Sequence, residues 1–196
     1  MNNKFIFPVI LILIAGSCIV FATNRDFRNA SIHQVAYFLS TLREYPLVRA
    51  SAEVRDDVHF DKTVVIGQRT NIKGNVWIGK HVKIQDDVKI WGDVNIGDYT
   101  HINPFVFIAS GFHDADDKTM LDPTLEPVVI GKCVRIDAGS IIFKGVTIGD
   151  KATIKVGSVV MDDVPEYAVV QGNPAKIVGY RENKDDNFCI PIWGKK

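Results

Sequence analysis

The sequence has no excess of charge of either sign. Its 196 residues contain 23 Lys and Arg and 23 Asp and Glu, so the formal net charge is zero. Proteins that bind a nucleic-acid backbone rely on an excess of cationic side chains. We therefore expect no nucleic acid among the partners of this chain.

Cysteine is scarce and scattered. The three cysteines, Cys18, Cys133 and Cys189, form no CxxC pair, which excludes a disulfide scaffold and paired-cysteine zinc sites. At most one disulfide is possible. Cys18 lies in an apolar stretch and Cys133 in a repeat described below, so we expect both to be small buried hydrophobic residues.

Long apolar runs are also rare, and the one present lies near the amino terminus. Residues 5–22 carry no charge, a length at the lower limit for a helix that crosses a bilayer. The small residues at its end, Val20 and Ala22, also suit a signal-peptidase site. Residues 1–24 are therefore predicted to be an apolar helix that serves as either a membrane anchor or a cleaved signal.

A helical linker is expected at residues 25–50. Within it, residues 31–44 place Ile32, Val35, Leu39 and other apolar side chains at helical spacing, with Ser31 as a candidate N-cap. This pattern predicts a short amphipathic helix.

An internal repeat of six residues dominates the rest of the chain. Every sixth residue from Val54 to Ile108 is apolar, most of them isoleucine, and the pattern resumes from Ile130 to Val160. A small or β-branched residue follows each of these positions by four. A period of six fits neither a helix nor one long strand, but it suits short strands separated by corners.

Recurring Ile-Gly pairs indicate that three hexads make one coil. Ile78-Gly79 and Ile96-Gly97 are 18 residues apart, as are Ile130-Gly131 and Ile148-Gly149. Glycine at these places suits a tight or positive-φ corner. Stacked coils of this kind bury their isoleucines in a continuous column. We predict an all-β solenoid at 51–181, followed by a tail at 182–196.

The repeat is interrupted between Ile108 and Ile130. Their separation of 22 residues is not a multiple of six, so a loop must leave the solenoid. Loops carried by a rigid scaffold are frequent places for binding and chemistry. This loop contains His113, whereas His59, His81 and His101 lie at outward positions of hexads, where we expect solvated side chains.

Several motifs, taken together, resemble the hexapeptide-repeat acyltransferases. They are IGDYTHINPFVFIASGFHD at 96–114, GVTIGD at 145–150, GSVV at 157–160 and GNPAK at 172–176. The nearest types are the colanic-acid, maltose and galactoside O-acetyltransferases. The resemblance implies a left-handed parallel β-helix with an extruded loop, a homotrimer and acetyl-CoA as acyl donor, and it implies no metal.

The resemblance also implies roles for individual residues. His113 takes the position of the family's general base, a role that suits imidazole because its ordinary pKa is about 6.5. Asp114 is a candidate to orient the ring. Ala138, Gly139, Val156, Gly157 and Ser158 would line the pantetheine arm of coenzyme A, and Lys176 would approach its nucleotide.

The resulting hypothesis is an acetyl-CoA-dependent O-acetyltransferase that acts on a hydroxyl of a sugar or a polysaccharide or lipopolysaccharide precursor. Because acetyl-CoA is a cytoplasmic metabolite, we expect a membrane-anchored protein with its catalytic domain in the cytoplasm; export after signal cleavage is the alternative. Two other functions remain open: a gamma-class carbonic-anhydrase-like metalloprotein, although the chain has no His-x₄-His pair, and a noncatalytic scaffold.

Overall fold

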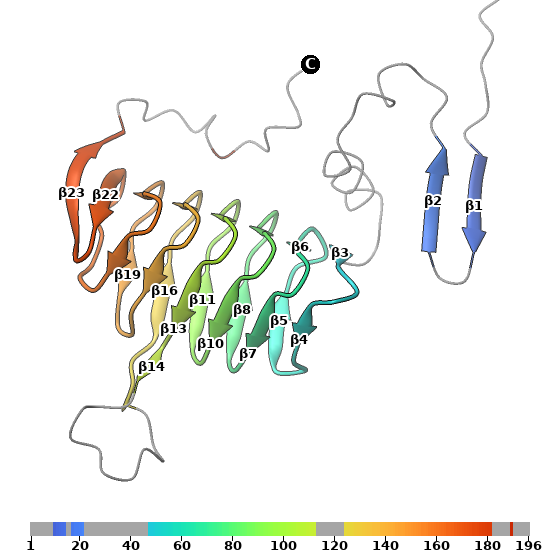
Figure 1. Ribbon diagram of the computed structural model, residues 1–196, viewed down its shortest axis with the longest axis horizontal. Coiled ribbons are helices and arrows are strands. Elements are labelled where there is room, and N and C mark those ends of the chain that lie inside the picture. The colour runs from blue at the N-terminus through green and yellow to red at the C-terminus, as the bar shows by residue number, and fades with distance from the viewer. Residues whose placement is uncertain (1–9, 15–16, 22–46, 113–123, 182–188, 190–196) are drawn as a thin grey trace, which may run out of the picture. The chain divides into compact units, whose positions relative to one another are not determined.

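The structure, a computed structural model, describes residues 10–14, 17–21, 47–112, 124–181 and 189 (Figure 1). The chain divides into two compact units, residues 1–39 and residues 40–196. The predicted amphipathic helix at 31–44 lies outside the described residues. Among the residues that are described there is no α-helix.

The first unit contains one antiparallel pair of strands, β1 (Ile10–Ile14) and β2 (Ser17–Phe21). These strands cover only part of residues 1–24, and the apolar helix expected there stays a prediction. No helix within the described ranges is long and apolar enough to cross a membrane.

The second unit is a parallel β-helix in which each coil contributes one strand to each of three sheets (Figure 1). The eight-stranded sheet contains β3 (Leu47–Val48), β6 (Val65–Ile66), β9 (Lys83–Ile84), β12 (His101–Ile102), β17 (Arg135–Ile136), β20 (Thr153–Ile154), β22 (Ala168–Gly172) and β23 (Ala175–Tyr180). The six-stranded sheet contains β4 (Glu53–Val54), β7 (Asn71–Lys73), β10 (Lys89–Trp91), β13 (Phe107–Ala109), β18 (Ile141–Ile142) and β21 (Val159–Val160). The five-stranded sheet contains β5 (Val58–Phe60), β8 (Val76–Ile78), β11 (Val94–Ile96), β16 (Val128–Ile130) and β19 (Thr147–Ile148).

The strand register confirms the six-residue repeat and the 18-residue coil. Ile90 pairs with Ile72 in the coil before it and with Ile108 in the coil after it. The repeat isoleucines from Ile66 to Ile154 are buried, and burying one such side chain stabilises a fold by about 1.5–3 kcal/mol. The parallel β-helix is therefore established, and its left-handedness stays a prediction from the resemblance.

Hydroxyl groups replace valine at some of the compact inward positions. Thr70, Thr100, Ser140 and Ser158 are fully buried, and each donates a hydrogen bond to a backbone carbonyl at a corner, such as Thr70 Oγ1 to Gln85 O at 2.7 Å and Ser140 Oγ to Lys155 O at 3.0 Å. Because a buried hydroxyl is costly unless it is bonded, these groups are compatible with the core.

Three columns of corner residues join the sheets. The Phe105 corner, between the eight- and six-stranded sheets, contains Arg69, Asp87, Phe105, Gly139 and Gly157, all with positive φ. The Cys133 corner, between the five- and eight-stranded sheets, contains His81, Tyr99, Cys133, Lys151 and Tyr167, also with positive φ. The Ser110 corner, between the six- and five-stranded sheets, contains Gly74, Gly92, Ser110 and Gly145.

The Ile-Gly glycines are explained by close packing between coils. A Cβ on Gly97 would lie 2.6 Å from the carbonyl carbon of Gly131 in the next coil, and no positive φ is involved at either residue. The left-handed backbone occurs two residues later, at Tyr99 and Cys133. Of the two reasons that the sequence offered for glycine here, the tight approach is the operative one.

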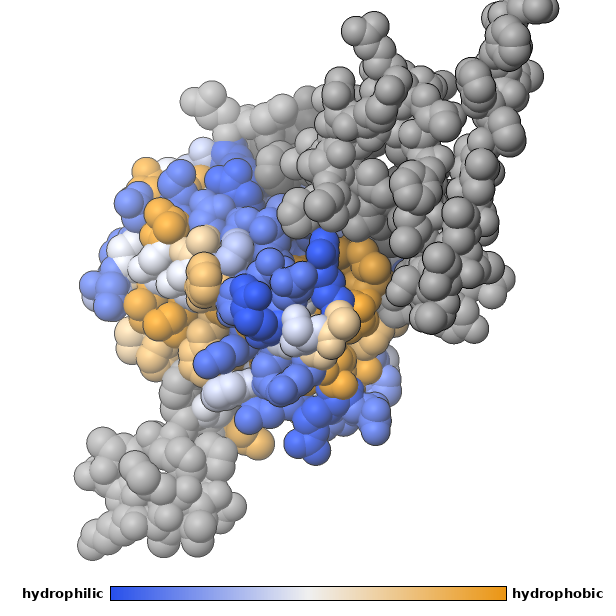
Figure 2. Space-filling view, turned by 45° about the vertical axis from the view of Figure 1, so that its right-hand side comes forward, coloured by the Kyte–Doolittle hydropathy of each residue, from blue (hydrophilic) through white to orange (hydrophobic). Residues whose placement is uncertain are grey.

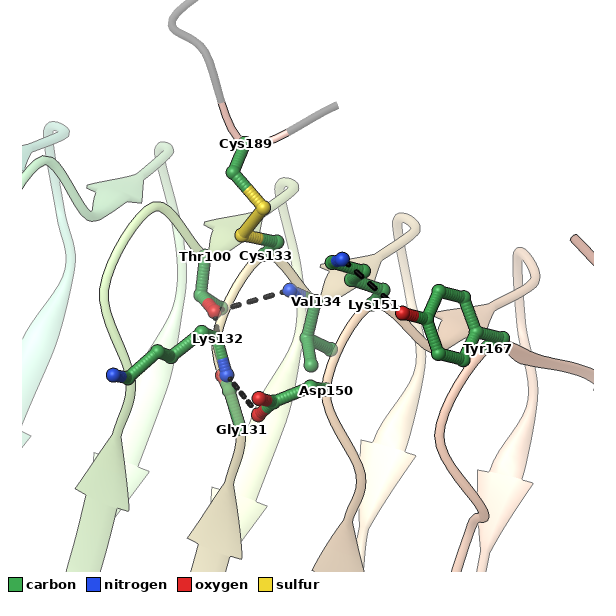
Figure 3. Close-up of a disulfide and its surroundings, with 9 residues drawn as sticks. All are labelled: Thr100, Gly131, Lys132, Cys133, Val134, Asp150, Lys151, Tyr167 and Cys189. Atoms are coloured by element: carbon green, nitrogen blue, oxygen red, sulfur yellow. Dashed lines mark hydrogen bonds between the residues drawn. A yellow bond between two sulfur atoms is a disulfide. The ribbon is translucent and has the colours of Figure 1, made fainter. Parts of the chain in front are cut away.

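A disulfide joins Cys133 to Cys189, with the Cα atoms 5.2 Å apart (Figure 3). Cys133 is 4% exposed, so the expectation of a buried side chain holds, but the expectation of a simple hydrophobic residue does not. The bridge ties a residue beyond the last strand to the corner that also contains Lys151 and Tyr167 (Figure 3). The tail is therefore covalently fixed to the solenoid at this position.

The loop leaves the solenoid at Ser110, as the break in the repeat predicts. Its base is the antiparallel pair β14 (Gly111–Phe112) and β15 (Thr124–Leu125). Ser110 is buried, and its hydroxyl accepts a hydrogen bond from the amide of Asp93 at 2.7 Å. At the far end of the coils, the antiparallel hairpin of β22 and β23 ends the eight-stranded sheet.

Candidate functional site

The Phe105 corner changes character along the solenoid. Its first three members carry the side chains of Arg69, Asp87 and Phe105, and its last two are Gly139 and Gly157. Backbone hydrogen bonds stack them, with Gly139 N donating to Pro104 O at 3.0 Å and Gly157 N donating to Ala138 O at 2.9 Å. The members of this corner that follow Phe105 therefore have no side chain, and only their backbone is exposed at the surface.

The bare part of this corner faces open space. A Cβ added to Gly139 or Gly157 would meet no atom within 4 Å other than those of the adjacent residues in the chain. Their φ values of +69° and +67° are close to the +61° of Phe105, so this backbone conformation accommodates other residues in the same column. Neither crowding nor conformation alone requires glycine here, and the two glycines leave a strip along the outside of the coils free for a ligand.

The other residues predicted to line the donor divide into two groups. Val156 is 65% exposed beside Gly157, and Ala138 is half-buried beside Gly139, so both border the open strip. Ser158 instead points into the coil, where its hydroxyl donates to Lys155 O at 2.6 Å. The side chain of Ser158 is therefore already used inside the solenoid.

Lys176 lies on β23 beyond the open strip. Its Nζ atom is 3.2 Å from Oδ2 of Asp162, and both side chains are largely exposed. An exposed ion pair of this kind contributes little to stability. Lys176, which is predicted to approach the nucleotide of the donor, is thus paired with the Asp162 carboxylate in the structure.

A pocket of about 310 Å³ opens on the outer face of the six-stranded sheet, between the Phe105 corner and the corner where the loop departs. It is lined by Asp87, Lys89, Trp91, Phe105, Val106 and Phe107. This pocket was not predicted from the sequence. The spacing contained a usable signal, because outward residues 18 positions apart, such as Asp87 and Phe105, must lie on neighbouring coils.

Phe105 belongs to both features. Its side chain is 67% exposed; it is the last bulky member of its corner, next to Gly139, and it lines the pocket. A ligand lying along Gly157 and Gly139 would therefore end at the pocket. The solenoid brings together a strip of bare backbone and a pocket, which suits a site for two substrates.

His113 and Asp114, the predicted base and its partner, lie outside the described residues. The described base of their loop, β14 and β15, adjoins Ser110 on the same coil as Phe105 and Phe107. The roles of His113 and Asp114 stay predictions.

His101 differs from the sequence expectation of a solvated side chain. It is half-buried on the outer face of the eight-stranded sheet, and burial lowers its pKa from 6.5 to about 4, with a further lowering by Lys83 and Arg135 that Asp137 opposes. The Gln85 amide nitrogen lies 2.9 Å from Nε2 of His101. Because an amide nitrogen only donates, the ring nitrogen accepts, as a neutral imidazole does.

Metal-binding side chains do not gather in the described ranges. Within them, no group of three or more His, Cys, Asp or Glu residues is arranged to hold a metal ion. On the face drawn in Figure 2, hydrophilic residues of the solenoid are interspersed with apolar ones. The strip at the Phe105 corner and the adjoining pocket make up the candidate site.

Comparison with known proteins identifies the repeat. Residues 75–110 match the family model of the bacterial transferase hexapeptide (six repeats). An acetyltransferase-like protein of Saccharomyces cerevisiae, YJL218W, is 38% identical over 126 residues, which are 64% of this chain and 60% of that protein. The galactoside O-acetyltransferase of Escherichia coli is 27% identical over 166 residues, 83% of this chain and 78% of that enzyme.

The chain carries the hexapeptide repeat of this transferase family at residues 75–110 and is similar to acetyltransferases. Among solved structures, PerB from Caulobacter crescentus in complex with CoA and GDP-perosamine is 26% identical, with a TM-score of 0.59 over 69% of this chain and 58% of PerB. AntD, an N-acyltransferase from Bacillus cereus, has the same fold, with a TM-score of 0.67 at 20% identity over 72% of this chain and 83% of AntD. The chain spans about 60% of the length of its yeast relative and of PerB.

Proposed function

We propose that this chain transfers an acetyl group from acetyl-CoA to a hydroxyl of a sugar or glycan precursor. The observation that carries the proposal is the Phe105 corner, where Gly139 and Gly157 leave an open strip that ends at the pocket beside Phe105. The comparisons support the donor and the class of acceptor, because PerB was solved with CoA and a sugar nucleotide.

The donor would lie along the strip with its thioester toward the pocket. In this arrangement backbone groups at Ala138 and Gly139 contact the pantetheine arm, Val156 packs against its apolar part, and Lys176 approaches a phosphate. A bare corner suits a narrow chain such as pantetheine, because close approach to the backbone requires the absence of a side chain. By the family resemblance we also propose a left-handed coil and a homotrimer.

The chemistry needs one base and no covalent enzyme intermediate. The acceptor hydroxyl oxygen attacks the thioester carbonyl carbon, and its proton passes to the imidazole of His113, which Asp114 orients. The tetrahedral intermediate then collapses, the C–S bond breaks, and the departing thiolate of coenzyme A takes the proton. General-base assistance of this kind is worth roughly 10²- to 10⁴-fold in rate.

For location, we propose that residues 1–24 direct the chain to the membrane and that the β-helix faces the cytoplasm, where acetyl-CoA is available. The Cys133–Cys189 disulfide favours the opposite side, because structural disulfides persist mainly in oxidising compartments. A fusion of alkaline phosphatase after residue 50 decides between the two. Phosphatase activity in that fusion would contradict a cytoplasmic β-helix.

The proposed function is tested by following thiol release from acetyl-CoA with a panel of sugars, for wild type and His113→Ala. We expect acceptor-dependent release that falls at least 100-fold in the variant. His59→Ala, a change on the outer face of β5, is the matched control and should leave the rate unchanged. Release that no acceptor stimulates would overturn the assignment.

Product analysis separates oxygen from nitrogen transfer. Hydroxylamine cleaves an acetyl ester and leaves an acetyl amide intact, so treatment of the labelled product identifies the acceptor atom. An amide product from an amino sugar would keep the acetyltransferase and reject the O-acetylation proposed here. Stoichiometric metal in the purified protein, combined with no thiol release, would instead favour the carbonic-anhydrase-like alternative.

A further inference from the structure

The pocket beside Phe105 has an ordered aromatic wall. The Nε1 atom of Trp91 donates to Oδ1 of Asn71 at 2.8 Å, and Phe107 contacts the indole edge-on with the ring centroids 5.1 Å apart. Trp91 pairs in register with Ala109 of the next coil, whose small side chain is 2% exposed. The indole is therefore held in place and has no bulky residue in register with it on the side of the next coil.

Two ammonium groups approach the same indole. Nζ of Lys73 lies over the ring at 4.1 Å from its centroid, and Nζ of Lys89, which also lines the pocket, is 5.8 Å away. Cations over an indole face are attracted by its quadrupole. Lys89 is exposed at the pocket, so its charge is accessible to a ligand.

The carboxylate of the pocket has a cationic partner. Asp87 accepts from Arg69 twice, at 2.8 Å to Nε and 2.6 Å to Nη2, and this pairing lowers the pKa of Asp87. The paired charges of Asp87 and Arg69 cancel at the pocket's edge. Among the residues that line the pocket, Lys89 therefore contributes the uncompensated charge, and that charge is positive.

We propose that this pocket binds the acceptor and selects a sugar that carries an anionic group, either a phosphate or a carboxylate. The apolar face of the sugar ring packs on Trp91 and Phe107, and the anionic group meets Lys89. Polarised C–H groups are attracted to the negative face of an aromatic ring. The proposal rests on the proposed transferase function, since it names the acceptor of that reaction.

Binding is measured directly, without the donor, by titration calorimetry on the full chain. The probes are galactose, galacturonate and galactose 1-phosphate, which share one ring and differ in charge. We expect one or both anionic probes to bind about tenfold more tightly than galactose, since hydrogen bonds to charged groups are worth about 1.5–3 kcal/mol. Preference for the phosphate over the carboxylate, or the reverse, identifies the source of the charge.

Two substitutions test the two parts of the pocket, the charge of Lys89 and the aromatic wall at Trp91. Lys89→Gln should remove the preference for the anionic probes and leave galactose binding unchanged, whereas Lys132→Gln, an exposed lysine on the Cys133 corner side, should change neither. Trp91→Leu should weaken all three probes by about fivefold or more. Trp77→Leu, an exposed indole on β8 of the five-stranded sheet, is its control. Unchanged thermal melts verify that each variant folds.

The outcomes distinguish this proposal from the proposed function. Equal affinity for neutral and anionic probes, or an anion preference that survives Lys89→Gln, would overturn the selection by charge even if acetyl transfer is observed. Anion-selective binding that requires Lys89 and Trp91 would support the pocket even if no thiol is released from acetyl-CoA, in which case the transferase assignment alone fails.

Discussion

Gly157 lies one coil above Gly139, its amide donating to the carbonyl of Ala138 at 2.9 Å, and apart from its own chain neighbours no residue has an atom within 4 Å of where the Cβ of either glycine would stand. The two positions differ from Phe105 in the same column by lacking a side chain, while the backbone conformation is alike. A side chain introduced at either glycine would therefore occupy the open strip, so a substitution there tests whether the donor binds in it.

The first prediction is that Gly157→Phe blocks the acyl donor. A phenylalanine in this left-handed conformation has a precedent at Phe105, so the chain should fold with a loss of about 1–2 kcal/mol. The KM for acetyl-CoA should rise at least tenfold, measured by steady-state thiol release. Gly157→Ala has the same backbone cost without the bulk and should keep KM within about twofold. A normal KM in the phenylalanine variant would mean that the donor binds elsewhere.

The second prediction concerns the ion pair between Lys176 and Asp162. If Lys176 approaches a phosphate of the donor, Asp162 competes for it, so Asp162→Asn should lower KM for acetyl-CoA several-fold at low salt. Raising the salt should reduce this gain, because exposed charges are screened. Lys176→Met should raise KM, and in its background Asp162→Asn should have little effect. Independent effects of the two changes would contradict a shared phosphate site.

The third prediction is that the tail bridge stabilises the solenoid. The disulfide closes a chain segment with a sequence separation of 56 residues, and loss of a bridge of this kind typically costs about 2–4 kcal/mol. Cys189→Ser should lower the melting temperature. Dithiothreitol added to the wild type should lower its melting temperature by a similar amount. Cys18→Ser is the control and should have no comparable effect. Identical melts with and without reductant would show that the bridge contributes nothing.

The fourth prediction is a loss of stability in acid that depends on His101. The folded pKa is about 4 against 6.5 for the free side chain, so the unfolded chain binds more protons between these values. The stabilising effect of the neutral ring is complete above pH 6.5 and is lost as the pH falls toward 4, by about 1–3 kcal/mol. Denaturant titrations at pH 7 and pH 4.5 measure it. His101→Gln should flatten the dependence, and His59→Gln should preserve it.

The fold was predictable because the isoleucines of the repeat all point toward the inside of the solenoid. An isoleucine at every sixth position, as at Ile72, Ile90 and Ile108, has to face inward if the coil is to bury it, so the period alone indicates the coil length and the break at the loop. The same arithmetic could have placed Lys73 beside Trp91, since they are 18 residues apart.

Other features could not be obtained in this way. The disulfide was not predicted because Cys189 lies beyond the repeat, where residue spacing does not indicate which part of the solenoid a residue contacts. The low pKa of His101 depends on burial and on cations from neighbouring coils, Lys83 and Arg135. The open strip depends on what is missing around Gly139, and a sequence shows a glycine without showing whether crowding, conformation or a ligand requires it.

The bridge between Cys133 and Cys189 also gives the solenoid a mechanical polarity. Each coil of a solenoid touches only its neighbours, so a force applied at one end detaches coils in sequence. Pulling from the amino-terminal side would peel away the coils that precede Cys133. The later coils, from β17 to the hairpin of β22 and β23, lie inside a covalent ring and would resist extension. The bare strip at Gly139 and Gly157 lies within that ring, and the aromatic wall at Trp91 and Phe107 lies outside it.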